Sequence, residues 1–176
     1  MQKAAKCRCQ LFHVAAEGVQ NVFTIREGIE SDLDDALRLI KELAVYEREP
    51  DAVVTTVETM AVDGFGENPV FGFFVAESEG RIVGISLYYD RYSTWRGRRL
   101  YLEDLIVTES YRGRGIGKAL FDRTVEKAKA EGYCGMVWQC LDWNEPAIDF
   151  YKKYEAKIEK EWLNCSLEQN QLDLKR

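Results

Sequence analysis

The chain has 176 residues, of which 46% are hydrophobic, 31% charged and 12% aromatic, and it contains 3 prolines. This composition excludes disorder and a small disulfide-stapled scaffold, because a chain of this length buries roughly two-thirds of its unfolded surface in one core. The formal net charge of −6 argues against a nucleic-acid-binding protein and favours the attraction of cationic small molecules. Its apolar runs are all short, so the sequence predicts no membrane-spanning helix.

The cysteines are odd in number and lack the paired spacing of a zinc site, so free thiols in a reducing cytoplasm are predicted. Residues 1–21 are predicted to be a dispensable, flexible extension, since three basic residues before a broken apolar stretch do not make a signal sequence. Cys7, Cys9 and His13 lie in this extension. Three metal ligands on an unstructured arm would make a weak site, and no metal is expected.

Residues 22–176 are predicted to form one domain of alternating strands and helices. Spacing of apolar residues, turn residues and helix caps sets the boundaries. In chain order we expect a strand at Val22–Arg26, helices at Leu33–Glu47 and Thr55–Gly64, strands at Val70–Glu77, Ile82–Asp90 and, after a loop at Arg91–Arg98, Arg99–Val107, a helix at Gly115–Glu131, a buried strand at Gly135–Leu141, a helix at Asn144–Tyr154, and a closing strand or strand pair at Lys157–Leu167.

Local signals explain several of these boundaries. Ser31 with Asp34, and Thr55 with Glu58, resemble capping boxes at the starts of the first two helices. The four residues 78–81 favour a tight turn, so the strands on either side are expected to pair as an antiparallel hairpin.

The strongest chemical signal is the segment 112–118, RGRGIGK, between a strand and the longest helix. Its three alternate glycines let the backbone turn sharply and aim several amides at one point beside a helix N-terminus, which makes a cradle for an anion. The spacing fits neither a Walker loop nor a dinucleotide-binding fingerprint. Taken alone, such a turn is also compatible with a purely structural role.

Residues 111–117 resemble the Arg/Gln-x-x-Gly-x-Gly/Ala pyrophosphate loop of the GNAT acetyltransferase superfamily, and Asp142–Tyr151 resembles that family's Asn…Tyr helix. Three shorter segments resemble the spermidine/spermine acetyltransferases and their thialysine-acetylating relatives: Leu39–Ala44, Asp63–Gly66 and Tyr101–Asp104. The resemblance spans about residues 22–162. Within it, Tyr92–Trp95 is more similar to the thialysine branch, because the polyamine enzymes carry aspartate at the position of Ser93.

The resemblance implies an α/β GNAT fold, with a central mixed and mostly antiparallel sheet flanked by helices. The sheet would be splayed between Arg99–Val107 and Gly135–Leu141 to admit the pantetheine arm of acetyl-coenzyme A. It also implies a homodimer that uses acetyl-coenzyme A and binds a small cationic amine. With the charge, the short apolar runs and the cysteine pattern, the sequence predicts a cytoplasmic protein that holds no metal and binds neither nucleic acid nor membrane. The implied cofactor-binding residues are Leu105, Ile106, Val107, Arg112, Gly113, Arg114, Gly115, Ile116, Gly117, Lys118, Asn144, Pro146 and Ala147.

Two residues are the expected catalytic groups. An alkylamine is protonated at neutral pH, so acetyl transfer needs a base. Glu103 lies in an apolar strand where burial would tune it for that work, and the alternative is an ion pair with Arg98 or Arg99. Tyr151, seven residues after Asn144 and on the same side of the helix, is the expected proton donor to the leaving thiolate. The alternative for Tyr151 is a core residue.

The residues implied for amine binding are Glu103 together with Tyr46, Glu47, Trp95 and Asp104. A carboxylate–ammonium contact would orient the substrate. The alternative is a solvated helix end beside an ordinary aromatic core residue.

Glu155 departs from the family pattern, which has glycine after the tyrosine-bearing helix. A non-glycine residue in a left-handed cap costs about 1–2 kcal/mol, so either the turn differs or the strain is tolerated.

The favoured function is amine acetylation by direct attack in a ternary complex, with no acyl-enzyme, because neither Cys134 nor Cys140 has a histidine partner in prospect. Two other functions stay open: a non-catalytic sensor of acyl-coenzyme A, and a protein or peptide N-acetyltransferase. The presence of both Glu103 and Tyr151 argues against the sensor.

Overall fold

The computed structural model describes residues 10–14 and 21–172 and divides the chain into two units, Met1–Gln139 and Cys140–Arg176. The first unit holds a six-stranded sheet with the strands side by side in chain order. The strands are β1 (Gln10–Val14), β2 (Asn21–Glu27), β3 (Gly72–Ser78), β4 (Arg81–Ser93), β5 (Gly97–Val107) and β6 (Met136–Trp138). Its helices are α1 (Leu33–Tyr46), α2 (Val57–Phe65) and α3 (Ile116–Ala130), with short 3-10 turns η1 (Glu30–Asp32) and η2 (Glu109–Tyr111).

Neighbouring strands are antiparallel from β1 to β5, and β6 alone runs parallel to its neighbour. The pairing of β5 with β6 covers Leu100 to Leu102 and then stops, although β5 continues to Val107. Within residues 10–14 and 21–172, no strand pairs with 103–107 on the side away from β4. The sheet is therefore open along this edge, as the sequence predicts.

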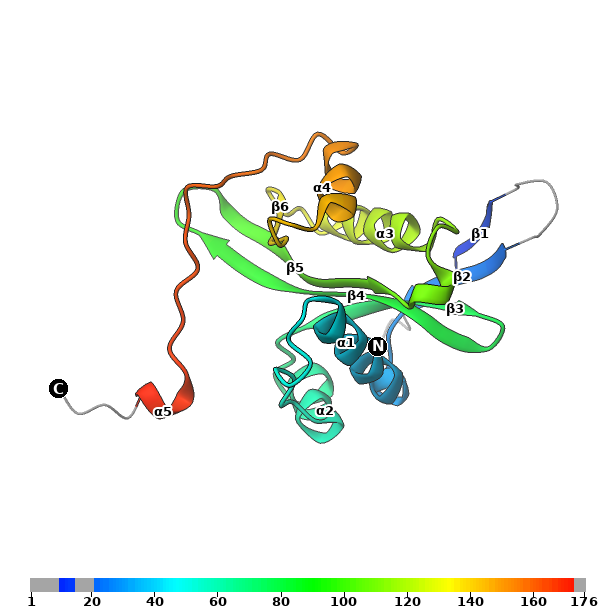
Figure 1. The fold of residues 1–176 in the computed structure, drawn as a ribbon, viewed down its shortest axis with the longest axis horizontal. Coiled ribbons are helices and arrows are strands. Elements are labelled where there is room, and N and C mark those ends of the chain that lie inside the picture. Colours follow the sequence, from blue (N-terminus) through cyan, green and yellow to red (C-terminus); the bar gives the residue numbers. More distant parts are fainter. Residues whose placement is uncertain (1–9, 15–20, 173–176) are drawn as a thin grey trace, which may run out of the picture. The chain divides into compact units, whose positions relative to one another are not determined.

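Helices cover both faces of the sheet, with α3 on one side and α1 and α2 on the other (Figure 1). Alternation along the strands supplies each layer with its own apolar side chains. Two contacts tie helices to β4: Ser86 and Thr124 of α3 share a buried hydrogen bond of 2.6 Å, and Arg38 of α1 donates to the carbonyl of Ile82 at 2.8 Å. The α3 layer includes Phe23, Phe74, Val83, Leu100 and Leu120, and the α1 layer includes Leu33, Leu39, Val75, Ile85 and Ile106.

The predicted hairpin is confirmed, but the loop predicted at Arg91–Arg98 is wrong. Glu79 and Gly80 form the β3–β4 turn with φ of 53° and 72°. The next hairpin is much tighter than expected, because β4 extends to Ser93 and pairs there with Gly97. Only residues 94–96 are left as a turn. Extending the ladder satisfies backbone groups that a long loop would leave to solvent.

The first two helices begin differently from the predicted capping boxes. Asp32, and not Ser31, acts at the start of α1: its carboxylate accepts from the amide of Ile29 at 2.9 Å and pairs with Arg26 at 2.6 Å. The 3-10 turn ahead of α1 moves the helix start beyond Ser31. The α2 cap is Thr56, which accepts from the amide of Thr59 at 3.2 Å, one residue later than expected.

Two predicted strands fail in the C-terminal part. The strand predicted at Gly135–Leu141 shortens to the half-buried β6, because Cys140 and Leu141 are exposed and have no apolar layer to face. The strand predicted at Lys157–Leu167 is wrong: this segment has no regular structure and is almost fully exposed, so it has no buried face. The second unit instead contains α4 (Glu145–Lys152) and α5 (Gln169–Leu172).

Within the predicted extension of residues 1–21, the structure has the strand β1, which pairs with β2. The sequence predicted no element there. Cys7 and Cys9 lie outside the described residues, as does the side chain of His13.

Candidate functional site

The glycine-rich loop forms a backbone cradle at the start of α3. Gly113 and Gly115 have φ of 76° and 82°, a left-handed conformation that glycine adopts without strain. Gly115 is the N-cap of α3, and the first hydrogen bond of the helix runs from the amide of Ala119 to its carbonyl at 3.0 Å. The amides of the first turn therefore remain available to an anion, at the end of the helix that carries partial positive charge.

Two arginines fix this loop to its surroundings. Arg112 donates from Nε to the carbonyl of Val107 at 2.9 Å, and its Cζ lies 5.0 Å from the centre of the Tyr46 ring. Arg114 donates to the carbonyl of Ser110 at 2.9 Å. Arg112 therefore joins the glycine loop to the end of β5 and, through the Tyr46 ring, to the C-terminal end of α1. Three predicted site segments meet here.

The open edge of β5 leads toward the loop. Leu105 and Val107 pack against the α3 layer, whereas Ile106 is buried in the α1 layer. The three residues implied for cofactor binding thus share a backbone edge, although their side chains alternate between the two faces. An unpaired strand edge offers N–H and C=O groups to an extended ligand that carries amides.

Glu103 occupies an extra position in β5. On β4, Leu87 pairs with Asp104 and the next residue, Tyr88, pairs with Leu102, so Glu103 has no partner and forms a β-bulge. The bulge places Tyr101 and Asp104 on the same face of the sheet, which is the face that α1 covers. Bulges commonly occur beside active sites, where they redirect a side chain.

Three carboxyl groups gather at this point, from Glu47, Glu103 and Asp104. Burial, followed by the negative charges of Glu103 and Glu47, raises the pKa of Asp104 to about 7. Burial also raises the pKa of Glu47. The sequence predicted burial for Glu103, but Glu103 is exposed and the desolvated carboxyl is its neighbour Asp104. The bulge explains this difference, since it removes Glu103 from the alternation of the strand.

Glu103 has a tyrosine neighbour that the sequence analysis missed. Burial, followed by the negative charge of Glu103, raises the pKa of Tyr89 to about 12. The rings of Tyr89 and Tyr101 stack, with centroids 4.9 Å apart. Pairing the two predicted strands in register would have shown that these tyrosines face one another.

The alternative ion pair of Glu103 is not found among the described residues. Arg98 pairs instead with Asp90 at 2.9 Å on the opposite face of the sheet, and Arg99 donates from Nη2 to the carbonyl of Met136 at 2.6 Å. Of the residues implied for amine binding, Trp95 lies apart from the carboxyl cluster. It is 85% exposed in the turn between β4 and β5.

The second unit carries the remaining predicted residues on α4. Asn144 is the N-cap, and its side chain accepts from the amide of Ala147 at 3.3 Å, with Pro146 in the first turn. Tyr151 is buried, and burial raises its pKa. The ring of Phe150 lies 5.2 Å from that of Tyr151 and 5.3 Å from that of Tyr154.

Glu155 has the left-handed conformation expected for a glycine, with φ of 56°. The amide of Ala156 donates to the carbonyl of Tyr151 at 3.3 Å and closes the helix end. Of the two alternatives for this position, the chain keeps the turn and tolerates the strain.

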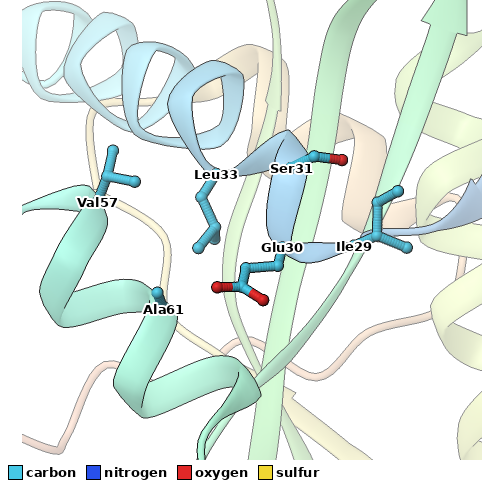
Figure 2. A pocket seen from close by; sticks show the side chains of 6 residues that line it. All are labelled: Ile29, Glu30, Ser31, Leu33, Val57 and Ala61. Atoms are coloured by element: carbon cyan, nitrogen blue, oxygen red, sulfur yellow. The ribbon is translucent and has the colours of Figure 1, made fainter.

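A separate hollow of about 560 Å³ lies between η1, the start of α1 and α2 (Figure 2). Its lining is mostly apolar, with Glu30 as the one titratable side chain. It lies at the opposite end of α1 from Glu47, so it belongs to neither the carboxyl cluster nor the glycine loop.

The described residues contain no group of three or more histidine, cysteine, aspartate or glutamate side chains arranged to hold a metal ion. Among the same residues, no helix has the length and apolar character needed to cross a membrane.

Comparison with known proteins adds independent information. Residues 33–155 match the acetyltransferase (GNAT) family. A thialysine N-epsilon-acetyltransferase of Sus scrofa is 44% identical over 141 residues, which cover 76% of this chain and 83% of that protein. A spermidine/spermine N(1)-acetyltransferase-like protein of Homo sapiens is 38% identical over 136 residues, 73% of this chain and 20% of that protein.

The fold has close counterparts among solved structures. An aminoglycoside acetyltransferase from an uncultured soil metagenomic sample superimposes with a TM-score of 0.69 at 22% identity, covering 83% of this chain and 95% of the other. At this identity the likeness concerns the fold alone.

Proposed function

The chain belongs to the acetyltransferase (GNAT) family and is an acyltransferase, and we propose that it moves an acetyl group from acetyl-coenzyme A to a primary amine of a small cationic substrate. The acceptor class is a thialysine-like amino acid or a polyamine, the substrates in the names of the relatives.

The observation that carries this proposal is the carboxyl cluster at the bulge. Glu47 and Asp104 are both desolvated, and repulsion between the carboxyls adds to the pKa shift of Asp104. A bound ammonium group would relieve that repulsion and gain charge-assisted hydrogen bonds. The stacked pair of Tyr89 and Tyr101 beside the cluster supplies aromatic surface that suits the alkyl part of a cation.

The proposed cofactor site is the glycine loop with the open edge of β5. The residues present fit the chemistry of coenzyme A: the glycine loop at the start of α3 would offer backbone amides to a pyrophosphate, and the unpaired edge of residues 103–107 would offer backbone groups to the amides of pantetheine. When bound, acetyl-coenzyme A supplies an activated thioester.

In the proposed mechanism, Glu103 accepts a proton from the substrate ammonium, directly or through water, so that the nitrogen can attack the thioester carbonyl. The carbon–nitrogen bond forms, the carbon–sulfur bond breaks, and Tyr151 donates a proton to the departing sulfur. The second proton that the nitrogen loses on becoming an amide passes through water and restores the hydroxyl of Tyr151. Asp104 and Glu47 hold the cationic substrate. The high pKa of Tyr151 keeps its hydroxyl protonated and able to donate at neutral pH.

The experiment is release of coenzyme A by the purified protein with a panel of thialysine, lysine, spermidine and acetylatable peptides. The proposal expects turnover with one or more free amines and a fall of about 10²–10⁴-fold in kcat for Glu103→Gln. Asp90→Asn, which changes a carboxylate on the other face of the sheet, is the matched control. Turnover with peptides alone would favour a protein acetyltransferase, and cofactor binding without any turnover would favour a sensor.

Homodimerisation stays a prediction of the family resemblance, which light scattering on the purified protein would test.

A further inference from the structure

Two arginines lie directly opposite one another on the face of the sheet that bears the carboxyl cluster. Arg91 on β4 pairs with Arg99 on β5, and the next pair along the ladder on the same face is Tyr89 with Tyr101. Like charges at directly opposed positions of a ladder repel one another. An anion beside the two guanidinium groups would relieve this repulsion.

The described residues provide no such anion. Neither Arg91 nor Arg99 makes an ion pair with a carboxylate in the part of the chain that the structure describes. The Nε atom of Arg99 is buried without a hydrogen-bond partner. Arg98, on the opposite face, shows the contrast, since its guanidinium is paired with Asp90 at 2.9 Å.

The two arginines are connected to the carboxyl cluster by aromatic surface. The Cζ of Arg91 lies 5.5 Å from the centre of the Tyr101 ring, and Tyr101 stacks on Tyr89 at 4.9 Å. Glu103 lies four positions after Arg99 on β5, about 13 Å of strand at 3.3 Å per residue. Because Arg91 reaches back over the ring of Tyr101, the distance that a ligand must span is shorter than that.

We propose that Arg91 and Arg99 form a subsite for the carboxylate of the acceptor, so that the enzyme recognises an amino acid whose side chain ends in an amine. The inference rests on the proposed function and assigns its substrate class. The amine of the acceptor lies at Glu103 and Asp104, its methylene chain crosses the rings of Tyr89 and Tyr101, and its carboxylate binds the guanidinium pair. A polyamine would bring a cation toward these arginines and be repelled.

The test compares two acceptors that differ in one group: L-thialysine, and the diamine of the same length without the carboxylate. Arg91→Gln is the main variant, because Arg91 is exposed and its substitution should leave the fold intact. We expect kcat/KM for thialysine to fall by about 10- to 150-fold, mainly through KM, as for loss of one charge-assisted hydrogen bond. The value for the diamine should stay the same or rise.

Three further variants sharpen the result. Arg91→Lys should keep part of the preference for thialysine, and Arg91→Glu should reverse it in favour of the diamine. Arg99→Gln should act like Arg91→Gln, with thermal unfolding measured beside it because Arg99 also binds the carbonyl of Met136. Arg96→Gln, in the exposed turn between the same strands, is the matched control and should change neither acceptor.

Equal losses for both acceptors, or no change in either, would overturn the carboxylate subsite while leaving acetyl transfer to amines in place. Failure of the proposed function itself would look different, because the wild-type protein would then release no coenzyme A with either acceptor.

Discussion

Glu47 at the end of α1 and Asp104 on β5 interact electrostatically, and the charge of Glu47 is one of the causes that raise the pKa of Asp104 to about 7. The larger causes are burial and the charge of Glu103. Near neutral pH, the charge of this cluster therefore depends on what is bound to it. A cationic ligand lowers the pKa of Asp104 and drives out its proton.

This relationship predicts how stability depends on pH. Between pH 4 and 7 the folded chain holds a proton on Asp104 that the unfolded chain has already released, so the free energy of unfolding falls as pH rises. Asp104→Asn removes this loss and should make the protein more stable than wild type at pH 8, with a smaller difference at pH 4. Denaturant unfolding at both pH values measures it.

The matched control for this experiment is Asp149→Asn, which changes an exposed carboxylate on α4. It should change the unfolding free energy by a similar small amount at both pH values. A constant difference between wild type and Asp104→Asn across this range would show that Asp104 titrates normally in the folded protein.

Acetyl-coenzyme A binding should depend on the backbone of the glycine loop. Gly115→Val places a branched side chain at a φ of 82° and displaces the amides at the start of α3, so we expect calorimetry to detect no binding. Gly132→Val is a matched control, since Gly132 has φ of 71° at the other end of the same helix. Unchanged cofactor affinity in Gly115→Val would contradict the assignment of the loop.

Ser93 should help to set the choice between lysine-like amines and spermidine. It ends β4 opposite Gly97 and carries no carboxylate for a distant second ammonium. Thialysine or lysine should therefore have a higher kcat/KM than spermidine, and Ser93→Asp should raise the spermidine ratio by about 10- to 150-fold, the effect of one charge-assisted hydrogen bond. Spermidine as the best substrate of the wild type would refute this prediction.

Tyr151→Phe should lower kcat by about 10²–10⁴-fold and leave cofactor affinity near the wild-type value. The hydroxyl is needed when charge develops on sulfur, whereas phenylalanine keeps the ring and its contact with Phe150. Tyr154→Phe is the control, because Tyr154 also contacts Phe150. This substitution should leave kcat nearly unchanged. A variant Tyr151→Phe that retained more than about a tenth of kcat, where chemistry limits turnover, would reassign Tyr151 to packing.

The sequence predicts elements reliably where a local signal marks both ends. The β3–β4 hairpin has a turn at Glu79 and Gly80, and α3 lies between Gly115 and Gly132, so turn and cap residues alone define them. Residues 157–167 contain apolar side chains, but no turn or cap residues mark the ends of this segment. They were predicted as a strand, but a strand also needs a neighbour and a buried face, which are properties of the whole fold.

Within the candidate site, motifs pointed to the glycine loop and to the carboxyl residues, but they did not show which carboxyl is desolvated. Asp104 is buried in place of Glu103 because one residue of β5 has no partner in the β4–β5 ladder. No local sequence pattern predicts a bulge of this kind. Tyr89 and Arg91, and the role proposed for Arg99, were missed for a related reason. Their significance comes from register with the opposite strand, and from which face of the sheet each of them shares.

Because of the bulge, the choice of reactive group at position 103 is independent of the packing of the sheet. Glu103 belongs to neither the α3 layer nor the α1 layer, because it lies outside the alternation that fills them. A change of residue type at this position therefore leaves both hydrophobic layers as they are. Natural variation can alter the reactive group here with little effect on folding, so that within one scaffold the chemistry of the site evolves independently of the stability of the sheet.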